Sequence, residues 1–451
     1  MSEKDPESQK LLAKDLEEDE SATATQKPWF YLPSNAERED EKSEALDGEK
    51  DEISSMQTFF NICNANLGTG ILAMPFVIRL AGLWGVVIII FIGFLGNYTG
   101  KILIDCLYEI DPTDGKRKRV RETYPQIGEA FHPTYGTYMV HIANCFDQFS
   151  HCALFLIMIG MVMKHAFPSI SLSESDWTLI IGLLILPTIF IRKMTQLAWL
   201  GTLTAWTAVV ISIVVLIYSL TKWQNWTTTT PPFNIHTVPI AIGVVMVSYS
   251  SAAYFPKMET AMMHPEEYNS IMNFSYSAVT FWKFFCGVIV YMTFTETTDQ
   301  IVALNVPHGV FRGALCVAVV VLALFFFTVP AFTIFDIIEN HLKIPWLAFN
   351  YTNQRRVIVS GYLLRFFLML FTLILAVCVP HFSLLMAFVG CSTGMILVLI
   401  FPCMFHLKIR WADLKNFDVA AELFVIGFAV IGGTLGIIYS SLALYTVYNE
   451  T

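Results

Sequence analysis

The sequence predicts an all-α, polytopic membrane protein with about eleven transmembrane helices. Hydrophobic residues make up 55% of the 451 residues, and the mean hydropathy is +0.56. These values exclude a soluble globular protein. Apolar runs close to the ~20 residues that a spanning helix needs recur along the chain. Two of these runs are interrupted at corresponding positions, a pattern typical of secondary transporters.

The negative charge of the chain is concentrated at its N-terminal end. Residues 1–52 hold 17 acidic and 7 basic residues, a net charge of −10 against −9 for the whole chain. We therefore expect residues 1–54 to form a disordered, acidic cytoplasmic tail. Because the tail lacks a basic stretch followed by an apolar core, we expect no cleaved signal peptide. Within it, Glu7, Leu11 and Leu12 match the acidic dileucine pattern that sorting adaptors read.

The predicted spanning segments divide into two sets of five and one further helix. They are 56–81, 83–108, 136–166, 177–191, 196–220, 238–262, 273–295, 311–338, 357–378, 381–404 and 419–445. The corresponding regions are a first repeat over 55–220, a lumenal loop over 221–237, a second repeat over 238–404, a cytoplasmic loop over 405–418, and an additional helix with a short lumenal C-terminus over 419–451.

Basic residues in the loops predict the orientation in the membrane. Lys and Arg gather at 116–121, 192–193 and 408–415, which all follow an even-numbered segment. Since such residues favour the cytoplasmic side, the N-terminus is predicted to be cytoplasmic and the C-terminus lumenal. Asn225, in Asn-Trp-Thr, then lies in a lumenal loop and is the predicted glycosylation site. All nine cysteines fall in apolar segments, so we expect no disulfide framework.

The first interruption lies in the stretch from Asn64 to Pro75, which contains two glycines, a threonine and two asparagines. Non-helical backbone at membrane depth survives only when it is buried in protein or lines a polar cavity. A half-helix that starts beyond Gly70 would present free N–H groups and a positive dipole end to a carboxylate. The predicted substrate-binding residues here are Asn64, Asn66, Leu67, Gly68, Thr69 and Gly70.

The second interruption is a small polar cluster ahead of Pro256, formed by Ser248, Tyr249, Ser250 and Ser251. Repeats of five segments run in opposite directions through the membrane, so a break at the start of each repeat indicates a shared binding site. Unwound carbonyl groups at the two breaks would accept hydrogen bonds from an ammonium, so a zwitterionic amino acid is the predicted substrate. The alternative is ordinary packing of small residues between helices.

Ionisable residues inside the predicted membrane segments are the remaining candidates, because they are costly there. Asp147 and His151 lie one turn apart on the same helix face and are predicted to couple transport to protons; the alternative is a packed polar pair. Lys101, Asp105 and Glu109 form an i, i+4, i+8 series, interpreted as a structural ion pair or a gate. Further candidates for gating pairs, whose partners the sequence alone does not identify, are Arg79, Glu259, Lys283, Asp336 and Arg365; the alternative is a structural role.

The sequence carries no recognisable pattern for a nucleophile with its base, a metal cluster or a phosphate loop, so we predict that the chain is not an enzyme and needs no cofactor. The expected partners are a small amino acid, protons with chloride or sodium as alternative ions, the lipid bilayer and sorting adaptors. No nucleic-acid partner is expected.

Several stretches carry a family resemblance. They are Asn97–Glu109, Arg119–Tyr124, Pro239–Gly243 with Ser248–Ser251, Val379–Met386, Gly390–Gly394 and Phe401–Leu407. Through them the chain resembles the amino acid/auxin permease family over roughly residues 55–445. The resemblance implies a LeuT-like fold of five-plus-five inverted repeats. It also implies secondary active transport of small neutral, GABA- or glycine-like amino acids into synaptic or endolysosomal vesicles. The proton electrochemical gradient would drive this transport. The resemblance further implies a coupling role for Asp147, where vesicular members carry a glutamate.

Other functions are compatible with the same residues. The string from Gly68 to Pro75 is more similar to the plasma-membrane and lysosomal branches of the family, which favours a carrier at one of those membranes. A sodium-coupled carrier and an amino-acid sensor that signals through its tail are further alternatives.

Overall fold

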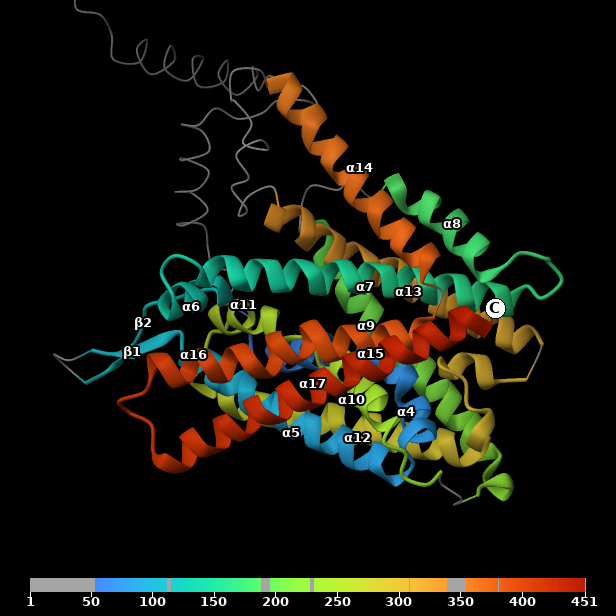
Figure 1. Ribbon diagram of the computed structural model, residues 1–451, viewed down its shortest axis with the longest axis horizontal. Helices are drawn as coiled ribbons and strands as arrows, with labels where there is room; N and C mark the ends of the chain where they lie inside the picture. Colours follow the sequence, from blue (N-terminus) through green and yellow to red (C-terminus); the bar gives the residue numbers. More distant parts are fainter. Residues whose placement is uncertain are drawn as a thin grey trace, which may run out of the picture. The chain divides into compact units, whose positions relative to one another are not determined.

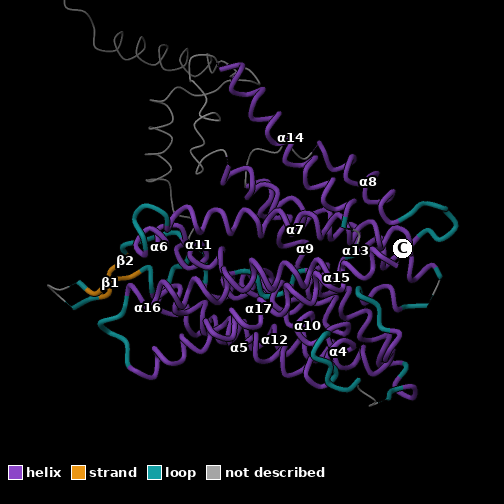
Figure 2. Tube along the Cα trace, in the orientation of Figure 1, coloured by secondary structure: helices purple, strands orange, loops and turns teal. Residues whose placement is uncertain are grey.

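The computed structural model describes residues 53–111, 115–187, 195–227, 231–307, 309–338, 354–379 and 381–450. Within these ranges, the side chains of residues 69, 195–205, 225, 354–362 and 450 lie outside the description. The described chain is almost entirely helical, and its two short strands, β1 (Tyr108–Ile110) and β2 (Arg117–Arg119), lie together beyond the helix ends (Figure 2).

The first predicted span consists of three consecutive elements: α3 (Ser55–Leu67), the 3₁₀ turn η1 (Thr69–Ala73) and α4 (Met74–Ala81). The side chain of Ser54 caps the start of α3 by accepting a hydrogen bond from the Gln57 amide at 3.3 Å. The helix ends at Leu67 because Gly68 has φ 38° and ψ −153°, a conformation that side chains with a Cβ rarely adopt. The two halves meet at an angle of 44°.

The next segment is shorter than predicted and leads into structure that the sequence analysis missed. Helix α5 (Leu83–Asp105) ends three residues early, and an antiparallel hairpin of β1 (Tyr108–Ile110) and β2 (Arg117–Arg119) follows. A short helix, α6 (Tyr124–Phe131), begins with a capping box at Thr123 and precedes the long α7 (Gly136–Ala166). The periodic apolar signal stops at Asp105, and hairpins with charged outer residues carry too little of it to be detected.

The remaining helices follow in the predicted order. They are α8 (Glu174–Ile185), α9 (Thr195–Thr221), α10 (Val238–Val247), α11 (Phe255–Thr260), α12 (Tyr268–Phe294), α13 (Val310–Asp336), α14 (Gln354–Cys378), α15 (Phe382–Val389), α16 (Phe401–Ile409) and α17 (Asn416–Glu450). The 3₁₀ turns are η3 (Trp223–Asn225), η4 (Ala252–Tyr254), η5 (Pro265–Glu267), η6 (Thr295–Thr297) and η7 (Val302–Asn305), and the π-helix η9 (Gly390–Ile400) joins α15 to α16.

Seven helices in the described ranges are long and apolar enough to cross a membrane, or eight if the bent pair α3–α4 counts as one span. The described apolar parts of α9 and α14, Trp206–Thr221 and Leu363–Cys378, are shorter. Large apolar side chains such as Phe94, Phe274 and Phe281 are 60% exposed or more, as expected of surfaces that face lipid. The chain is therefore a polytopic membrane-type protein, while the count of eleven crossings and the two repeats stay predictions.

Close helix packing brings the two interrupted segments together. A Cβ added at Gly96 of α5 would lie 2.9 Å from the Tyr276 ring of α12, so the glycine lets these helices approach closely. Helix α7 packs along α13, and α17 packs along α10, α15 and η9 (Figure 1). Helices α10 and α12 both contact η1, so the break after α3 lies against the second half of the chain.

Candidate functional site

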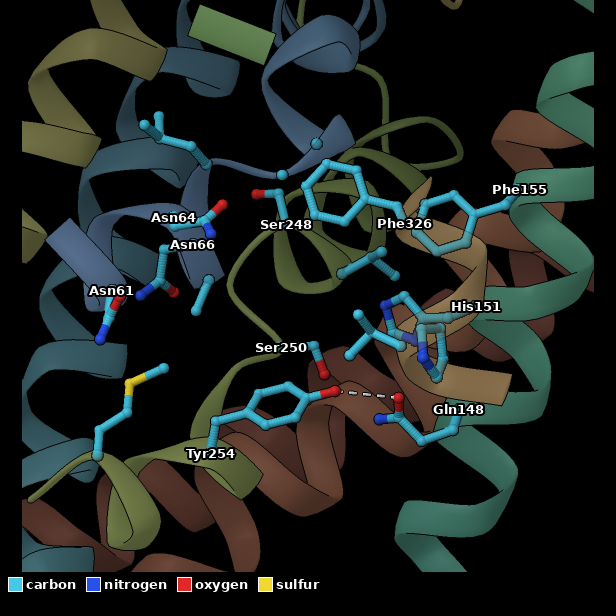
Figure 3. Close-up of a pocket in the computed structure, with 18 residues that line it drawn as sticks. Asn61, Asn64, Asn66, Gln148, His151, Phe155, Ser248, Ser250, Tyr254 and Phe326 are labelled. Carbon is cyan, nitrogen blue, oxygen red and sulfur yellow. Dashed lines mark hydrogen bonds between the residues drawn. The ribbon is translucent and has the colours of Figure 1, made fainter. Parts of the chain in front are cut away.

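A cavity of about 260 Å³ lies where the two interrupted segments meet α7 and α13 (Figure 3). Its lining residues are Asn61, Asn64, Ala65, Asn66, Leu67, Gly68, Gly70, Gln148, His151, Phe155, Val247, Ser248, Ser250, Tyr254, Met258, Phe326, Val329 and Pro330. These lining residues include no Asp, Glu, Lys or Arg. The cavity therefore suits a ligand without net charge, since an isolated charge in a low-dielectric cavity would be costly.

The first break supplies backbone groups to this cavity. The last carbonyl groups of a helix and the first N–H groups of the next one have no partner within their own helix. The end of α3 and the start of η1 meet at Gly68, and Gly68 itself lines the cavity. Asn66 supports the end of α3: its Nδ2 donates to the Ile62 carbonyl at 2.9 Å, and its Oδ1 accepts from the Ser251 hydroxyl at 2.8 Å.

That Asn66–Ser251 hydrogen bond joins the two breaks directly. A second link is the contact of Gly70 with Ser248, where a Cβ added at Gly70 would lie 2.3 Å from the Ser248 Cβ. Only a residue without a side chain fits between these backbones. The two interruptions that the sequence analysis paired are therefore in contact.

A buried lysine holds the end of α10. Lys283 of α12 is 0% exposed, and its Nζ donates to the Ser248 carbonyl at 2.7 Å and to the Ser248 hydroxyl at 3.0 Å. The ammonium also lies 3.4 Å from the centroid of the Tyr249 ring, a cation–π contact. A cation at a helix C-terminus interacts favourably with the helix dipole. The sequence marked Lys283 as a costly intramembrane charge but could not identify this partner.

Asp147 lies behind the cavity rather than in its lining. Its carboxylate is 2% exposed and accepts hydrogen bonds from Thr393 of η9 at 2.8 Å, Ser250 at 3.4 Å and Gln148 at 3.2 Å. His151 lies one turn away, with its Nδ1 3.4 Å from the Asp147 Oδ2 and 2.8 Å from the Asp147 carbonyl oxygen. The predicted pair is therefore in contact, and Ser250 and His151 connect it to the cavity.

The wall opposite the first break was missed by the sequence analysis. The rings of Phe155 and Phe326 stack at 5.9 Å, and Figure 3 shows them on the side of the cavity away from Asn61 and Asn64. Pro330 lies inside α13 and has no N–H to donate to the carbonyl of Phe326, four residues earlier. A proline within an apolar segment was the available signal for this wall.

Gln148 and Tyr254 form the other missed polar contact. The Tyr254 hydroxyl donates to the Gln148 Oε1 at 3.2 Å, and the Gln148 Nε2 donates to the Asn144 Oδ1 at the same distance. Both side chains face the cavity in Figure 3. They hold the end of the second break against α7.

Some predicted substrate-binding residues lie outside the lining. Tyr249 and Ser251 are fully buried; the Tyr249 hydroxyl bonds with that of Thr280 at 2.9 Å. The side chain of Thr69 lies outside the described part of the chain.

The ladder of Lys101, Asp105 and Glu109 is corrected, because α5 ends at Asp105 and Glu109 belongs to β1. Lys101 donates to Asn273, Asp105 pairs with Arg117, and Glu109 pairs with Arg121. Two of the three therefore hold the hairpin, and a gating role stays a prediction.

Two predictions concern other regions. Asn225 ends η3, between α9 and α10, with its side chain outside the description, so its glycosylation stays a prediction. Glu7, Leu11 and Leu12 lie outside the described residues.

The family described as "Transmembrane amino acid transporter protein" matches residues 51–446. The chain belongs to this amino acid transporter family. The resemblance drawn from the sequence motifs is confirmed, and so is the expectation of a transporter family rather than an enzyme.

Two curated relatives of this family member carry vesicular names. It is 31% identical to the vesicular inhibitory amino acid transporter of Homo sapiens, over 89% of this chain and 78% of the relative. It is 27% identical to the vesicular GABA transporter of Caenorhabditis elegans, over 92% of this chain and 85% of the relative. A solved Na⁺-coupled sialic acid symporter aligns over 85% of this chain and 90% of its own at 10% identity, with a TM-score of 0.43 that is too low to assign the fold.

Proposed function

We propose that this protein is a secondary active transporter that moves small neutral amino acids, GABA- or glycine-like, across a vesicular membrane. The observation that carries the proposal is the uncharged cavity at the junction of the two interrupted segments. A zwitterion has no net charge but needs a donor set and an acceptor set, and two helix ends supply both. The vesicular relatives support the same class of substrate.

In the proposed binding mode, the substrate carboxylate accepts hydrogen bonds from the first N–H groups of η1, beside Gly70. The positive end of the η1–α4 helix favours an anion there. The Lys283 amine group lies on the same side, behind Ser248.

The ammonium of the substrate would bind carbonyl groups at the ends of the opposing helices. Lys283 already occupies the carbonyl of Ser248, so that group is unsuitable. The last carbonyl groups of α3, from Ala65 to Leu67, and the Ser250 region line the cavity and are the better acceptors. This narrows the sequence-based proposal, which treated the residues from Ser248 to Ser251 alike.

Proton coupling is proposed to occur at Asp147 with His151. The carboxylate lies one hydroxyl, that of Ser250, away from the cavity, so its charge and the bound substrate affect each other through a short hydrogen-bonded path. Asp147→Asn keeps the shape of the side chain and removes its charge. It should leave substrate exchange intact and abolish pH-driven accumulation.

The test is uptake by purified protein in proteoliposomes with an imposed pH gradient, using labelled GABA, glycine, alanine and leucine. Accumulation that collapses with a protonophore supports the proposal. Binding without accumulation under any gradient would favour a sensor, and accumulation that requires sodium would favour a sodium-coupled carrier. Unchanged pH dependence in Asp147→Asn would remove this residue from the coupling path.

The vesicular destination and the topology are part of the same proposal. In the proposed topology, a LeuT-like arrangement with eleven crossings, the N-terminus is cytoplasmic and Asn225 is lumenal. Asn225→Gln should then remove a glycan-dependent mobility shift, and a wild-type protein without such a shift would contradict glycosylation at Asn225. Leu11→Ala with Leu12→Ala should move the protein to the cell surface; retention in vesicles would contradict the sorting role, and surface residence before the change would favour a plasma-membrane carrier.

A further inference from the structure

The hydroxyl of Thr393 has two hydrogen-bond acceptors within reach but only one proton to donate. Its Oγ1 lies 2.8 Å from the Asp147 Oδ1 and 3.2 Å from the Val389 carbonyl oxygen, one turn earlier in its own helix. The shorter contact is with the carboxylate, and hydrogen bonds to an ionised acceptor are the stronger kind. With Asp147 charged, the Thr393 proton therefore points to the carboxylate.

A proton taken up on the Asp147 Oδ1 would reverse this arrangement. The carboxylic acid O–H then donates to the Thr393 oxygen, and the Thr393 proton turns to the Val389 carbonyl. No proton is lost or created beyond the one that Asp147 takes up. The charge state of a residue on α7 thus determines whether a hydrogen bond forms within the helix that carries Thr393.

The π-helix η9, which carries Thr393, has a geometry and packing that suit it to respond to the charge state of Asp147. Residues Gly390–Ile400 form the π-helix η9, a rare geometry that is frequent at functional sites. It packs tightly on α10, since a Cβ added at Gly390 would lie 1.9 Å from the Gly243 carbonyl oxygen. The C-terminal end of α10 in turn lines the cavity through Val247 and Ser248.

We propose that Thr393 is a positioning residue that transmits the charge state of Asp147 to η9, and through η9 to α10 and the cavity. The inference rests on the proposed proton coupling at Asp147 and adds its second half, the element that responds. Thr393 does not titrate; it changes its donor direction. Ser250, the other hydroxyl donor to the same oxygen, connects the carboxylate to the cavity directly.

The titratable groups that face Asp147 are His151 on its own helix and Tyr254 of η4. The charged side chains that the structure describes on helices packed against α7 are Glu129 of α6, Glu174 and Asp176 of α8, Arg312 and Asp336 of α13, and Arg365 of α14. Of these, Glu174 pairs with Lys164 near the far end of α7, and Arg365 lies over the Phe335 ring. Among the residues that the structure describes, Thr393 is the η9 residue that hydrogen-bonds to the Asp147 carboxylate.

The test compares Thr393→Val, which keeps the shape and removes the hydroxyl, with Thr393→Ser, which keeps the hydroxyl. Ser392→Ala is the matched control, because within the described part of the chain the Ser392 hydroxyl bonds to carbonyl oxygens of the preceding turn, at Phe388 and Val389, and not to Asp147. Each variant is reconstituted in proteoliposomes, and two quantities are measured: gradient-free exchange of labelled substrate, and uptake as a function of pH.

We expect Thr393→Val to retain exchange and to shift the midpoint of the pH profile upward by roughly one unit, because the charged carboxylate loses one charge-assisted hydrogen bond. Thr393→Ser and Ser392→Ala should keep the wild-type midpoint. A wild-type midpoint in Thr393→Val would overturn the inference while leaving proton coupling intact. A flat pH profile in the wild type would instead contradict the proposed coupling.

Loss of exchange is also informative. If Thr393→Val is not recovered as a monodisperse protein, Thr393→Ala removes the same hydroxyl with less volume. Loss of exchange in both variants would assign Thr393 to the fold alone and overturn its positioning role.

Discussion

The contact between Gly70 and Ser248 allows a sharp test of whether the two interrupted segments must touch for transport. Gly70→Ala adds one methyl group whose carbon would lie 2.3 Å from the Ser248 Cβ and 2.8 Å from its Cα. Carbon atoms in contact are separated by about 3.5–4.0 Å, so the two backbones must part by about 1 Å. Lys283 resists that movement because it holds Ser248 by two hydrogen bonds.

The expected cost follows from these distances. Overpacking of this size typically destabilises a protein by about 1–3 kcal/mol. Alanine recovers up to about 1 kcal/mol through its better helix propensity, so the net loss of stability should be modest. Transport should suffer more, because a displacement of about 1 Å in a binding site can reduce a rate about 100-fold.

The assay is proteoliposome uptake at matched protein density, with the thermal midpoint in detergent measured in parallel. Gly427→Ala in α17 is the control, because a Cβ there would meet nothing within 4 Å. We expect Gly70→Ala to be folded with uptake reduced about 100-fold, and Gly427→Ala to transport as the wild type does. Normal uptake by Gly70→Ala, or an equal loss in Gly427→Ala, would refute the reasoning.

Two further predictions concern buried charges. Arg119→Ala leaves the 1%-exposed carboxylate of Glu259 without its ion-pair partner, and removing one partner of a buried pair costs about 3–5 kcal/mol. The thermal midpoint of unfolding should therefore fall strongly. The control is Arg117→Ala, whose partly exposed ion pair is worth at most about 1 kcal/mol, and an equally small fall in both variants would contradict the burial argument. Lys283→Met fills a similar volume but leaves the Ser248 carbonyl unsatisfied, at about 1–3 kcal/mol. Because this carbonyl lies at the cavity, uptake should fall about 5- to 150-fold, on the scale of about 1.4 kcal/mol per factor of ten. Wild-type uptake at unchanged substrate affinity would show that the end of α10 needs no donor from Lys283.

Much of the helical architecture was accessible from local patterns. The long apolar runs that became α5, α7, α12, α13 and α17 are visible because burial in lipid or protein requires nearly continuous hydrophobicity. The hairpin at Tyr108–Ile110 and Arg117–Arg119 was missed, because its strands are short and mostly polar. The helical series through Lys101, Asp105 and Glu109 was wrong for the same reason: the end of α5 depends on local turn geometry rather than on periodicity.

The residues of the candidate site likewise fall into those that the sequence predicted and those that it did not. Gly68 and Gly70 were identified because glycine and polar residues in an apolar run weaken a helix locally. This signal comes from residues that are close together in the sequence. The contributions of Gln148, Phe155 and Phe326 were missed, because helical spacing alone does not tell which face of α7 or α13 meets the breaks. Lys283 stood out as a charge, but its partner lies 35 residues away in the chain.

The sequence by itself determined that this is a membrane protein of the amino acid transporter class, with two weakened helices and an acidic tail, since composition and local motifs carry that information. Only the tertiary structure decided that the weakened helices touch at Gly70 and Ser248, and that Lys283 occupies a carbonyl otherwise available to a substrate. It also decided that the carboxylate of Asp147 faces Thr393 of η9. These contacts depend on how distant helices pack, and packing depends on side-chain shape across the whole bundle rather than on any local pattern.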